Sequence, residues 1–344
     1  MNGVFAGILL MALPLLVVVA ALTALHYYLR RRYLDYLVRI FQEKPLFVIP
    51  RGQPQPDAED ITLHSPDGIT LRACYLHTTQ PRKGVILFGL EFGSNRWSCQ
   101  SYCDYLLAAG YDVFACEVRN QGDSTKQPSY ATLQWATNLD LLDTQTALAY
   151  LKSRPDADSR GVGLFGISKG GTLGLLAAAN DPFIRCAVTD GAFATYSTMV
   201  PYMRQWIAIY NNRYWVQKLL PAWFYGQLAL VGIRRVERAQ KLRYLHLESA
   251  VQQFGRPWLM IHGEQDSYIK PQMAREVFDY AAPPCEFWLV EKAKHNQALH
   301  VAGDAYRSRV LAFFDQYLAQ AVPVVPFRRR GTPHPEVTGS LAEH

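Results

Sequence analysis

The hydrophobic and polar positions divide the chain into short segments with two different periods. In residues 60–64 and 69–76, polar and apolar side chains alternate, and Asp67 and Gly68 lie in the turn between these runs. Alternation predicts half-buried strands, and an Asp-Gly turn between two such strands is typical of a β-hairpin. We therefore expect the two runs to pair as a hairpin.

Beyond the hairpin, short apolar runs alternate with longer stretches of helical period. Uninterrupted apolar runs predict strands buried on both faces, and their alternation with helices is typical of a mostly parallel sheet covered by helices on both sides. The expected fold class is therefore α/β. The predicted strands are residues 84–90, 112–118, 161–165, 184–189, 258–262 and 286–290, and the predicted helices are residues 97–109, 133–153, 169–180, 271–282 and 304–320.

The connection after the sixth predicted strand is longer than the others. About 67 residues separate the run that ends at residue 189 from the next run, whereas such connections usually need only a few residues outside a helix. We expect a helical insertion, or cap, at about residues 193–255. Its aromatic residues either fill the core of this helical unit, form a lid over a pocket or face a membrane; they are Trp206, Tyr210, Tyr214, Trp215, Trp223, Phe224 and Tyr225.

The first part of the chain is apolar. Residues 3–25 carry no formal charge, and at about 1.5 Å per residue a helix of this length measures roughly 34 Å, more than a bilayer core of about 30 Å. A cleaved signal peptide would have a basic start, a shorter apolar run and a small-residue cleavage site, which this segment lacks. We therefore expect one transmembrane anchor that tolerates Pro14.

Positive charges follow this segment and predict its orientation. Arg30, Arg31, Arg32 and Arg39 all lie after the apolar run, and Lys and Arg concentrate on the cytoplasmic side of membrane helices. The rest of the chain is therefore expected on the cytoplasmic side of a single-pass membrane protein. The expected organisation is an anchor at residues 1–29, a juxtamembrane linker at 30–58, an α/β domain at 59–321 and a disordered tail at 322–344.

Composition and charge exclude several classes of protein. The 344 residues are 49% hydrophobic and 19% charged, which allows a large buried core and excludes a disordered chain. The net charge of +6 is small and no nucleic-acid-binding motif is present, so nucleic acid is not an expected partner. The six cysteines are too scattered for a disulfide scaffold or a zinc site, so we expect reduced thiols and no metal.

The clearest chemical motif is a G-x-S-x-G sequence formed by Gly166, Ser168 and Gly170. It follows a predicted buried strand and precedes a predicted helix, which is the context of a nucleophile elbow. The glycines leave room where a strained turn packs against neighbouring backbone, and the helix N-terminus favours negative charge nearby. Because a serine hydroxyl needs a base to take its proton, this interpretation requires an acid and a histidine later in the chain.

Two later residues satisfy this requirement. Asp266 follows the predicted strand at 258–262, and His295 follows the predicted strand at 286–290. Both would lie at the carboxyl edge of the parallel sheet, where such folds place their sites. The alternatives from the sequence are Asp190 and Glu264 for the acid, and His262 and His300 for the histidine.

These residues resemble those of the α/β-hydrolase superfamily over about residues 60–320. The branch with serine aminopeptidases and monoacylglycerol lipases is the most similar, and the Ser-Lys-Gly elbow is similar to that of acyl-CoA thioesterases. The resemblance implies that Ser168 is the nucleophile, that His295 acts first as base and then as acid, and that Asp266 orients the imidazole and stabilises its charged form. The acid, Ile and Pro of residues 266–271 match the family pattern.

The resemblance also implies an oxyanion hole made of backbone N–H groups. Lys169 would supply one group, and Phe92 or Glu91 would supply the other. Many family members carry His-Gly after the third strand, whereas this chain does not, but a backbone donor does not depend on the side chain. The Lys169 and Arg96 side chains are expected either to be solvated or to attract an anionic substrate.

The implied activity is cleavage of a carboxylic ester through an acyl-enzyme, without a cofactor. Because the anchor at residues 3–25 would hold the site next to lipid, the expected substrate is a small-molecule or lipid-like acyl ester. Acyl-CoA thioesterase and serine aminopeptidase-like activities are alternatives on the same triad. A further alternative, of another class, is a non-catalytic membrane scaffold that uses this fold to bind a partner.

Overall fold

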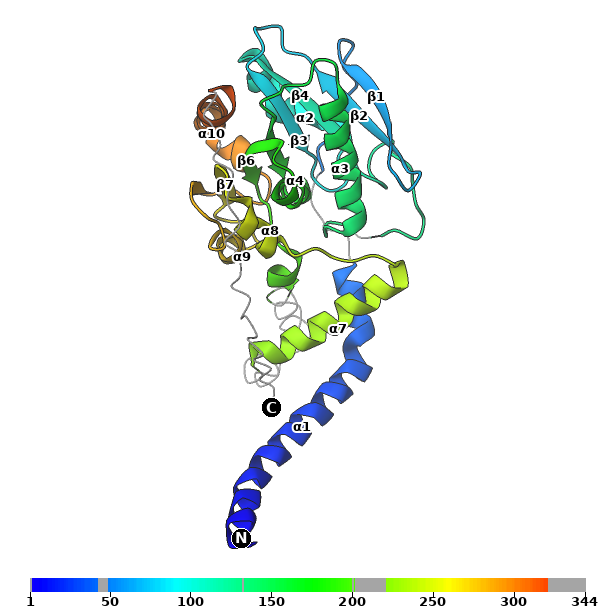
Figure 1. Cartoon of the computed structure of the whole chain (residues 1–344), viewed down its shortest axis with the longest axis vertical. Helices are drawn as coiled ribbons and strands as arrows, with labels where there is room; N and C mark the ends of the chain where they lie inside the picture. The colour runs from blue at the N-terminus through cyan, green and yellow to red at the C-terminus, as the bar shows by residue number, and fades with distance from the viewer. Residues whose placement is uncertain (1, 43–48, 132, 200, 202–220, 321–344) are drawn as a thin grey trace, which may run out of the picture.

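The structure, a computed structural model, describes residues 2–42, 49–131, 133–199, 201 and 221–320. It consists of a body built around one sheet and a long helix, α1 (Asn2–Phe41), that extends from the body (Figure 1). The predicted tail at 322–344 and part of the predicted cap, residues 202–220, lie outside the described residues.

The sheet has eight strands in the order β1-β2-β4-β3-β5-β6-β7-β8. The β1–β2 and β2–β4 pairs are antiparallel, and all other pairs are parallel, so the predicted hairpin and the mostly parallel sheet are confirmed. The strands are β1 (Glu59–His64), β2 (Thr70–Leu76), β3 (Gly84–Gly89), β4 (Tyr111–Glu117), β5 (Val162–Ile167), β6 (Ile184–Asp190), β7 (Trp258–Gly263) and β8 (Cys285–Val290).

Helices cover both faces of the sheet, as the apolar runs predict. Along β3, Val85 and Leu87 enter the core on one face, while Ile86 and Phe88 enter the core on the other. The first face packs against four helices: α3 (Asn138–Ser153), α4 (Lys169–Asn180), α8 (Leu247–Phe254) and α9 (Pro271–Phe278). The second face packs against two helices, α2 (Cys99–Ala108) and α10 (Ala298–Phe314). The short 3-10 helix η1 (Arg96–Ser98) directly precedes α2.

Three helices differ from those predicted from the sequence, one of them α9, which ends at Phe278 and not at residue 282. α3 begins at Asn138, not at residue 133, because Thr137 accepts a bond from the Asp140 N–H at 3.2 Å while the Asp140 carboxylate accepts the Thr137 N–H at 3.1 Å. α10 begins six residues before the predicted 304, with a kink at Gly303, and the short π-helix η2 (Asp315–Ala319) follows it. Gly303 has φ of 50°, which breaks the helical period that the prediction used.

α1 continues without a break through Phe41, so residues 30–41 of the expected linker are helical. This end of α1 lies against α7 (Ala222–Gln240), where Leu34 and Phe41 are buried. The Phe41 ring stacks on Trp135 at 5.0 Å, and its carbonyl accepts the Trp135 indole N–H at 2.9 Å. These contacts fix the end of α1 to the body.

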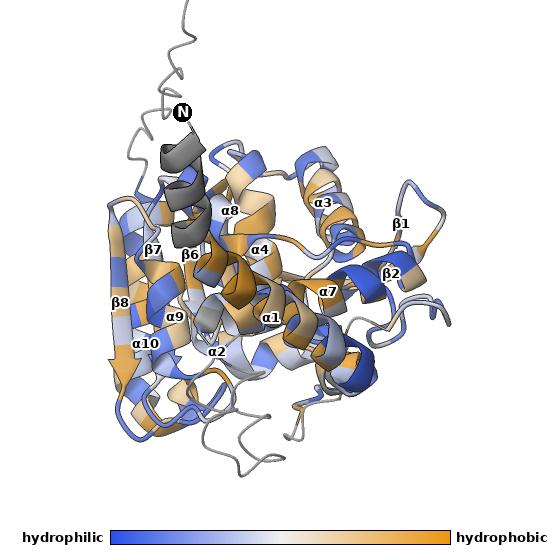
Figure 2. Cartoon of the chain, turned by 90° about the horizontal axis from the view of Figure 1, so that it is seen from below, coloured by the Kyte–Doolittle hydropathy of each residue, from blue (hydrophilic) through white to orange (hydrophobic). Residues whose placement is uncertain are grey.

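The other part of α1 stands free of the body (Figure 1). Its large apolar side chains between Leu13 and Val19 are more than half exposed. By length and composition, residues Ala12–Tyr36 could cross a membrane. Seen from below, the hydrophobic colouring of α1 gives way to strongly hydrophilic residues where it meets α7 (Figure 2).

The described aromatic residues of the cap have different environments. Phe224 and Tyr225 are buried, and Phe224 joins a third apolar core between α1, α7 and the loop after β7. They therefore fill the core of the helical unit, which was one of the three alternatives. Trp223 is 57% exposed. Trp206, Tyr210, Tyr214 and Trp215 lie outside the described residues.

Candidate active site

Ser168 lies at the sharp turn between β5 and α4. Its backbone has φ of 51° and ψ of −120°, a region that a non-glycine residue adopts only when the surrounding structure enforces it. The Ser168 N–H donates to the carbonyl of Asp190 on the neighbouring strand β6 at 2.8 Å. The elbow therefore holds the serine in a strained conformation at the carboxyl edge of the sheet.

The glycines around Ser168 are required by close backbone contacts. A Cβ at Gly166 would lie 2.4 Å from the Cα of Gly171, and a Cβ at Gly170 would lie 2.1 Å from the carbonyl carbon of Gly89. Both gaps are too short for any side chain. The second contact also brings the end of β3 against the first turn of α4, so the loop after β3 begins beside the N-terminus of α4.

The structure brings Ser168, His295 and Asp266 together. The Ser168 Oγ lies 3.0 Å from the His295 Nε2, and the His295 Nδ1 lies 2.6 Å from the Asp266 Oδ2. The other carboxylate oxygen, Oδ1, accepts the N–H groups of Tyr268 at 2.9 Å and Ile269 at 2.8 Å. These backbone bonds hold the carboxylate in one orientation, so the three side chains form a continuous hydrogen-bonded series.

The alternative acids are directed elsewhere. Asp190 is buried at the end of β6, and its Oδ2 accepts a bond from the Tyr306 hydroxyl at 3.1 Å. Burial raises the pKa of the Asp190 carboxyl to about 7. Glu264 is exposed, and its Oε2 accepts the Lys292 N–H at 3.1 Å. In the structure Asp266 is therefore the carboxylate bonded to His295.

The alternative histidines also lie apart from the serine. His300 is exposed on α10. His262 is fully buried at the end of β7, where its Nε2 lies 2.8 Å from the carbonyl of Ile269 and 3.5 Å from the Asp266 Oδ2. Burial lowers the pKa of His262 and favours its neutral form. His262 therefore supports the loop that carries Asp266, a role that the sequence did not indicate.

Glu91 and Asn296 form a second support that the sequence analysis missed. The buried Glu91 carboxylate accepts bonds from the Asn296 side-chain N–H at 2.7 Å and from the Tyr102 hydroxyl at 3.1 Å. Burial raises the pKa of Glu91. Because Asn296 directly follows His295, this bond links the histidine loop to the loop after β3. The contact joins residues 205 positions apart, so no local pattern could reveal it.

The Lys169 and Arg96 side chains are neither solvated nor available to a substrate, contrary to both expectations. The Lys169 ammonium group lies 3.1 Å from the Asp140 carboxylate and donates to the Leu133 carbonyl at 2.8 Å. The Arg96 guanidinium donates to Glu117 at 3.1 Å and is 4% exposed as a residue. Buried charges need such partners, because removing them from water without compensation is unfavourable.

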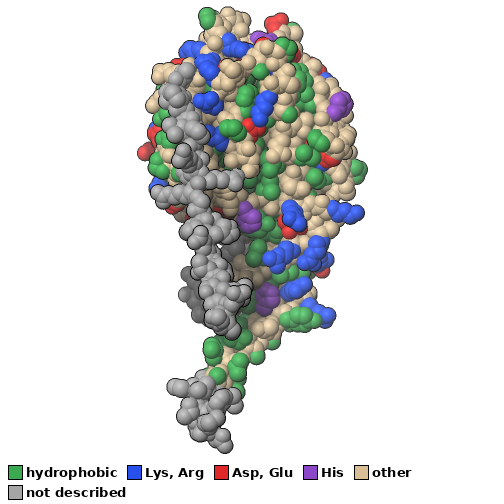
Figure 3. Space-filling model, viewed as in Figure 1, with side chains coloured by type: hydrophobic (Ala, Val, Ile, Leu, Met, Phe, Trp, Pro, Cys, Tyr) green, Lys and Arg blue, Asp and Glu red, His purple; other side chains and the backbone are tan. Residues whose placement is uncertain are grey.

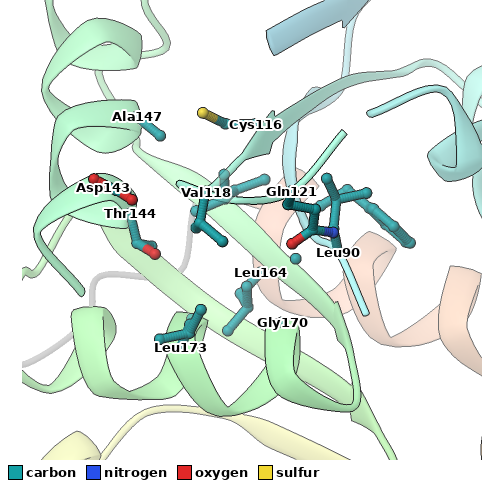
Figure 4. A pocket seen from close by; sticks show the side chains of 14 residues that line it. Leu90, Cys116, Val118, Gln121, Asp143, Thr144, Ala147, Leu164, Gly170 and Leu173 are labelled. Carbon is teal, nitrogen blue, oxygen red and sulfur yellow. The ribbon is translucent and has the colours of Figure 1, made fainter. Parts of the chain in front are cut away.

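A cavity of about 30 Å³ lies behind the elbow (Figure 4). Gly170 and Leu173 of α4 line it, together with Asp143 and Thr144 of α3 and Val118 after β4. A volume of this size accommodates one or two water molecules and is too small for an acyl chain. Among the described residues, no group of three or more His, Cys, Asp or Glu side chains could hold a metal ion.

Comparisons with known proteins agree with this architecture. The sequence profile of the alpha/beta hydrolase family matches residues 89–309. The chain is 25% identical over 268 residues to the uncharacterized protein YfhR of Escherichia coli K12, covering 76% of this chain and 82% of YfhR. It is 22% identical over 298 residues to the alpha/beta hydrolase domain-containing protein WAV2 of Arabidopsis thaliana, covering 82% of this chain and 90% of WAV2.

Solved structures show the same fold. The Pyrococcus furiosus esterase Pf2001 superposes with a TM-score of 0.59 at 18% identity, covering 80% of this chain and 100% of the esterase. The protein belongs to the alpha/beta hydrolase family, as the elbow and the later acid and histidine suggested.

Proposed function

We propose that this protein is a membrane-anchored serine hydrolase that cleaves a hydrophobic or lipid-like carboxylic ester. The observation that carries the proposal is the series of hydrogen bonds from Ser168 through His295 to Asp266, at 3.0 and 2.6 Å. It has the geometry that an activated serine nucleophile requires. The exposed apolar side chains of α1 support the membrane anchor.

In the proposed mechanism, the Ser168 oxygen attacks the ester carbonyl while the His295 Nε2 takes the hydroxyl proton. Asp266 accepts the Nδ1–H bond and stabilises the imidazolium that forms. The C–O bond to the alcohol then breaks, and the imidazolium gives its proton to the departing oxygen. Water attacks the acyl-enzyme in the same way and releases the acid and free Ser168.

Backbone N–H groups stabilise the negative charge that develops on the carbonyl oxygen. Lys169 is the first residue of α4, and the first N–H groups of a helix have no partner within that helix. The contact between Gly89 and Gly170 supports a second donor from the loop that contains Glu91 and Phe92. One such donor contributes about 2.7 to 4 kcal/mol to transition-state stabilisation. Since the Lys169 side chain is paired with Asp140, recognition at the elbow needs no anionic group on the substrate.

Fluorophosphonate labelling of the full chain tests the serine nucleophile. We expect wild-type protein to be labelled and Ser168→Ala to be unlabelled, with similar circular dichroism spectra. No labelling of folded wild type would support the scaffold alternative. Hydrolysis rates for p-nitrophenyl esters of increasing chain length, acyl-CoA and aminoacyl amides then separate esterase, thioesterase and aminopeptidase activities.

A further inference from the structure

A groove of about 380 Å³ lies between α1 and α7 and shares no lining residue with Ser168, His295 and Asp266. Figure 3 shows Lys and Arg side chains gathered where α1 meets the body. Four of the six residues that line the groove are arginines. The lining consists of Arg30 and Leu34 from α1, and Val231, Arg234, Arg235 and Arg238 from α7.

The acidic residues of these helices leave the groove positive. α1 and α7 together contain seven arginines and two acidic residues, Asp35 and Glu237. Asp35 lies 2.5 Å from Arg235, and the Glu237 carboxylate accepts the backbone N–H of Tyr244 at 3.0 Å. Several guanidinium groups close together repel one another, so a bound anion would stabilise them. The groove therefore suits a negatively charged ligand.

The position of the groove along α1 indicates where the anion comes from. Arg30 lies five residues beyond the apolar run 3–25, which is about 7 Å along a helix axis. The headgroup layer occupies roughly this depth next to the hydrocarbon core. Tyr27 and Tyr28 are 56% and 59% exposed just before Arg30, as interfacial aromatic residues are.

We propose that this arginine groove binds the phosphate group of an anionic membrane lipid. Guanidinium groups donate paired hydrogen bonds that match the geometry of phosphate oxygens. Leu34 and Val231 complete the lining beside the arginines. The proposal rests on the membrane anchoring proposed above. Since α7 belongs to the cap, a lipid bound here holds the cap of the hydrolase against the bilayer.

Lipid binding by the detergent-solubilised full chain tests the proposal. The probes are dioctanoyl phosphatidic acid, dioctanoyl phosphatidylserine, dioctanoyl phosphatidylcholine and inorganic phosphate, with affinity measured by thermophoresis. We expect the two anionic lipids to bind more tightly than phosphatidylcholine and phosphate. The triple variant Arg30→Gln, Arg234→Gln, Arg238→Gln should lose affinity for them by about 100-fold, since each arginine near a membrane surface contributes about fivefold.

Arg275→Gln is the matched control, because Arg275 is an exposed helical arginine that does not line the groove. It should bind the anionic lipids like wild type. Equal affinity for phosphatidylcholine, or unchanged affinity in the triple variant with a wild-type circular dichroism spectrum, would overturn the headgroup site. Inorganic phosphate binding as tightly as the lipids would overturn the lipid as ligand.

Two further measurements separate this proposal from the proposed function. Carbonate extraction of cell membranes reports anchoring, and we expect wild type and the triple variant to remain in the pellet. Fluorophosphonate labelling in detergent reports the reactivity of Ser168, and we expect both proteins to be labelled. If carbonate extracts both proteins, the membrane anchor and with it the membrane lipid as ligand are refuted. If wild type is labelled and stays in the pellet but binds no anionic lipid, only the proposed groove is refuted.

Discussion

Positively charged side chains have different environments beside Ser168 and between α1 and α7. Beside the serine, the side chains of Lys169 and Asp140 are 5% and 0% exposed, and they lie 3.1 Å apart. Between the helices, the side chains of Arg235 and Asp35 are 53% and 74% exposed. A buried charge requires a fixed partner because water cannot solvate it, whereas an exposed charge remains stable without one.

Because of this difference, the two regions would recognise ligands in different ways. Around Ser168 the cations are held in ion pairs, so the proposed oxyanion hole relies on backbone N–H groups. Between α1 and α7 the arginines outnumber the acids, so their net charge remains available to an anion.

Asp266→Asn should reduce kcat/KM for a p-nitrophenyl ester by about 10⁴-fold without unfolding the protein, because the amide cannot hold the required imidazole tautomer. The matched control is Asp190→Asn, at a buried carboxyl that bonds to Tyr306 and not to His295. It should keep most of the activity. Equal losses in both variants would refute the assignment of Asp266 as the orienting acid.

Lys169→Met should destabilise the full chain by about 3 to 5 kcal/mol, because it leaves the Asp140 carboxylate buried without its cation. Thermal unfolding in detergent measures the change. Adding Asp140→Asn, which still accepts a bond from Thr137, should restore part of the stability. A melting temperature unchanged by Lys169→Met would contradict the pairing of buried charges beside the elbow.

Asp190→Asn should also change how stability depends on pH. The folded-state pKa of Asp190 is raised to about 7 from 3.8, so the folded protein binds more protons between these values and this carboxyl's contribution to stability falls as pH rises from about 4 to 7. The variant should lack this fall and, above pH 7, gain up to about 4 kcal/mol relative to wild type. Melting temperatures of both proteins are measured from pH 5 to 8.5. If they change with pH in the same way, the pKa of Asp190 is not raised.

Asp35→Asn should change the free energy of unfolding by at most about 1 kcal/mol, because exposed ion pairs are weak and screened by salt. The same variant increases the positive charge of the groove, so it should tighten binding of dioctanoyl phosphatidic acid at low salt. A loss of stability as large as that of Lys169→Met would remove the distinction between the two regions.

Much of the fold could be predicted because the signals are local. Alternation in residues 60–76 and the apolar runs beyond them predicted all eight strands, since a strand buried on one or both faces must carry the matching pattern. The elbow was recognisable because Gly166 and Gly170 sit on either side of Ser168 between a strand and a helix. The start of α3 was misplaced because its cap depends on two side chains that bond only when Thr137 and Asp140 adopt the capping geometry.

The choice between Asp266 and Asp190 shows the limit of local signals. The Ile and Pro after Asp266 favoured this residue, but Asp190, at the end of the buried strand β6, remained an alternative. In the folded chain the loop after β8 carries His295 toward Asp266, while α10 places the Tyr306 hydroxyl on Asp190. Which carboxylate meets the histidine depends on contacts between segments far apart in the sequence.

The strands, the elbow and the long apolar helix are evident from the order of amino acids, because backbone sterics and side-chain burial act over a few neighbouring residues. In contrast, the pairing of Lys169 with Asp140, the bond from Asn296 to Glu91 and the arginine-lined groove between α1 and α7 arise only when the chain is folded. Distances between distant segments follow from how the whole core packs, and a linear pattern does not contain them.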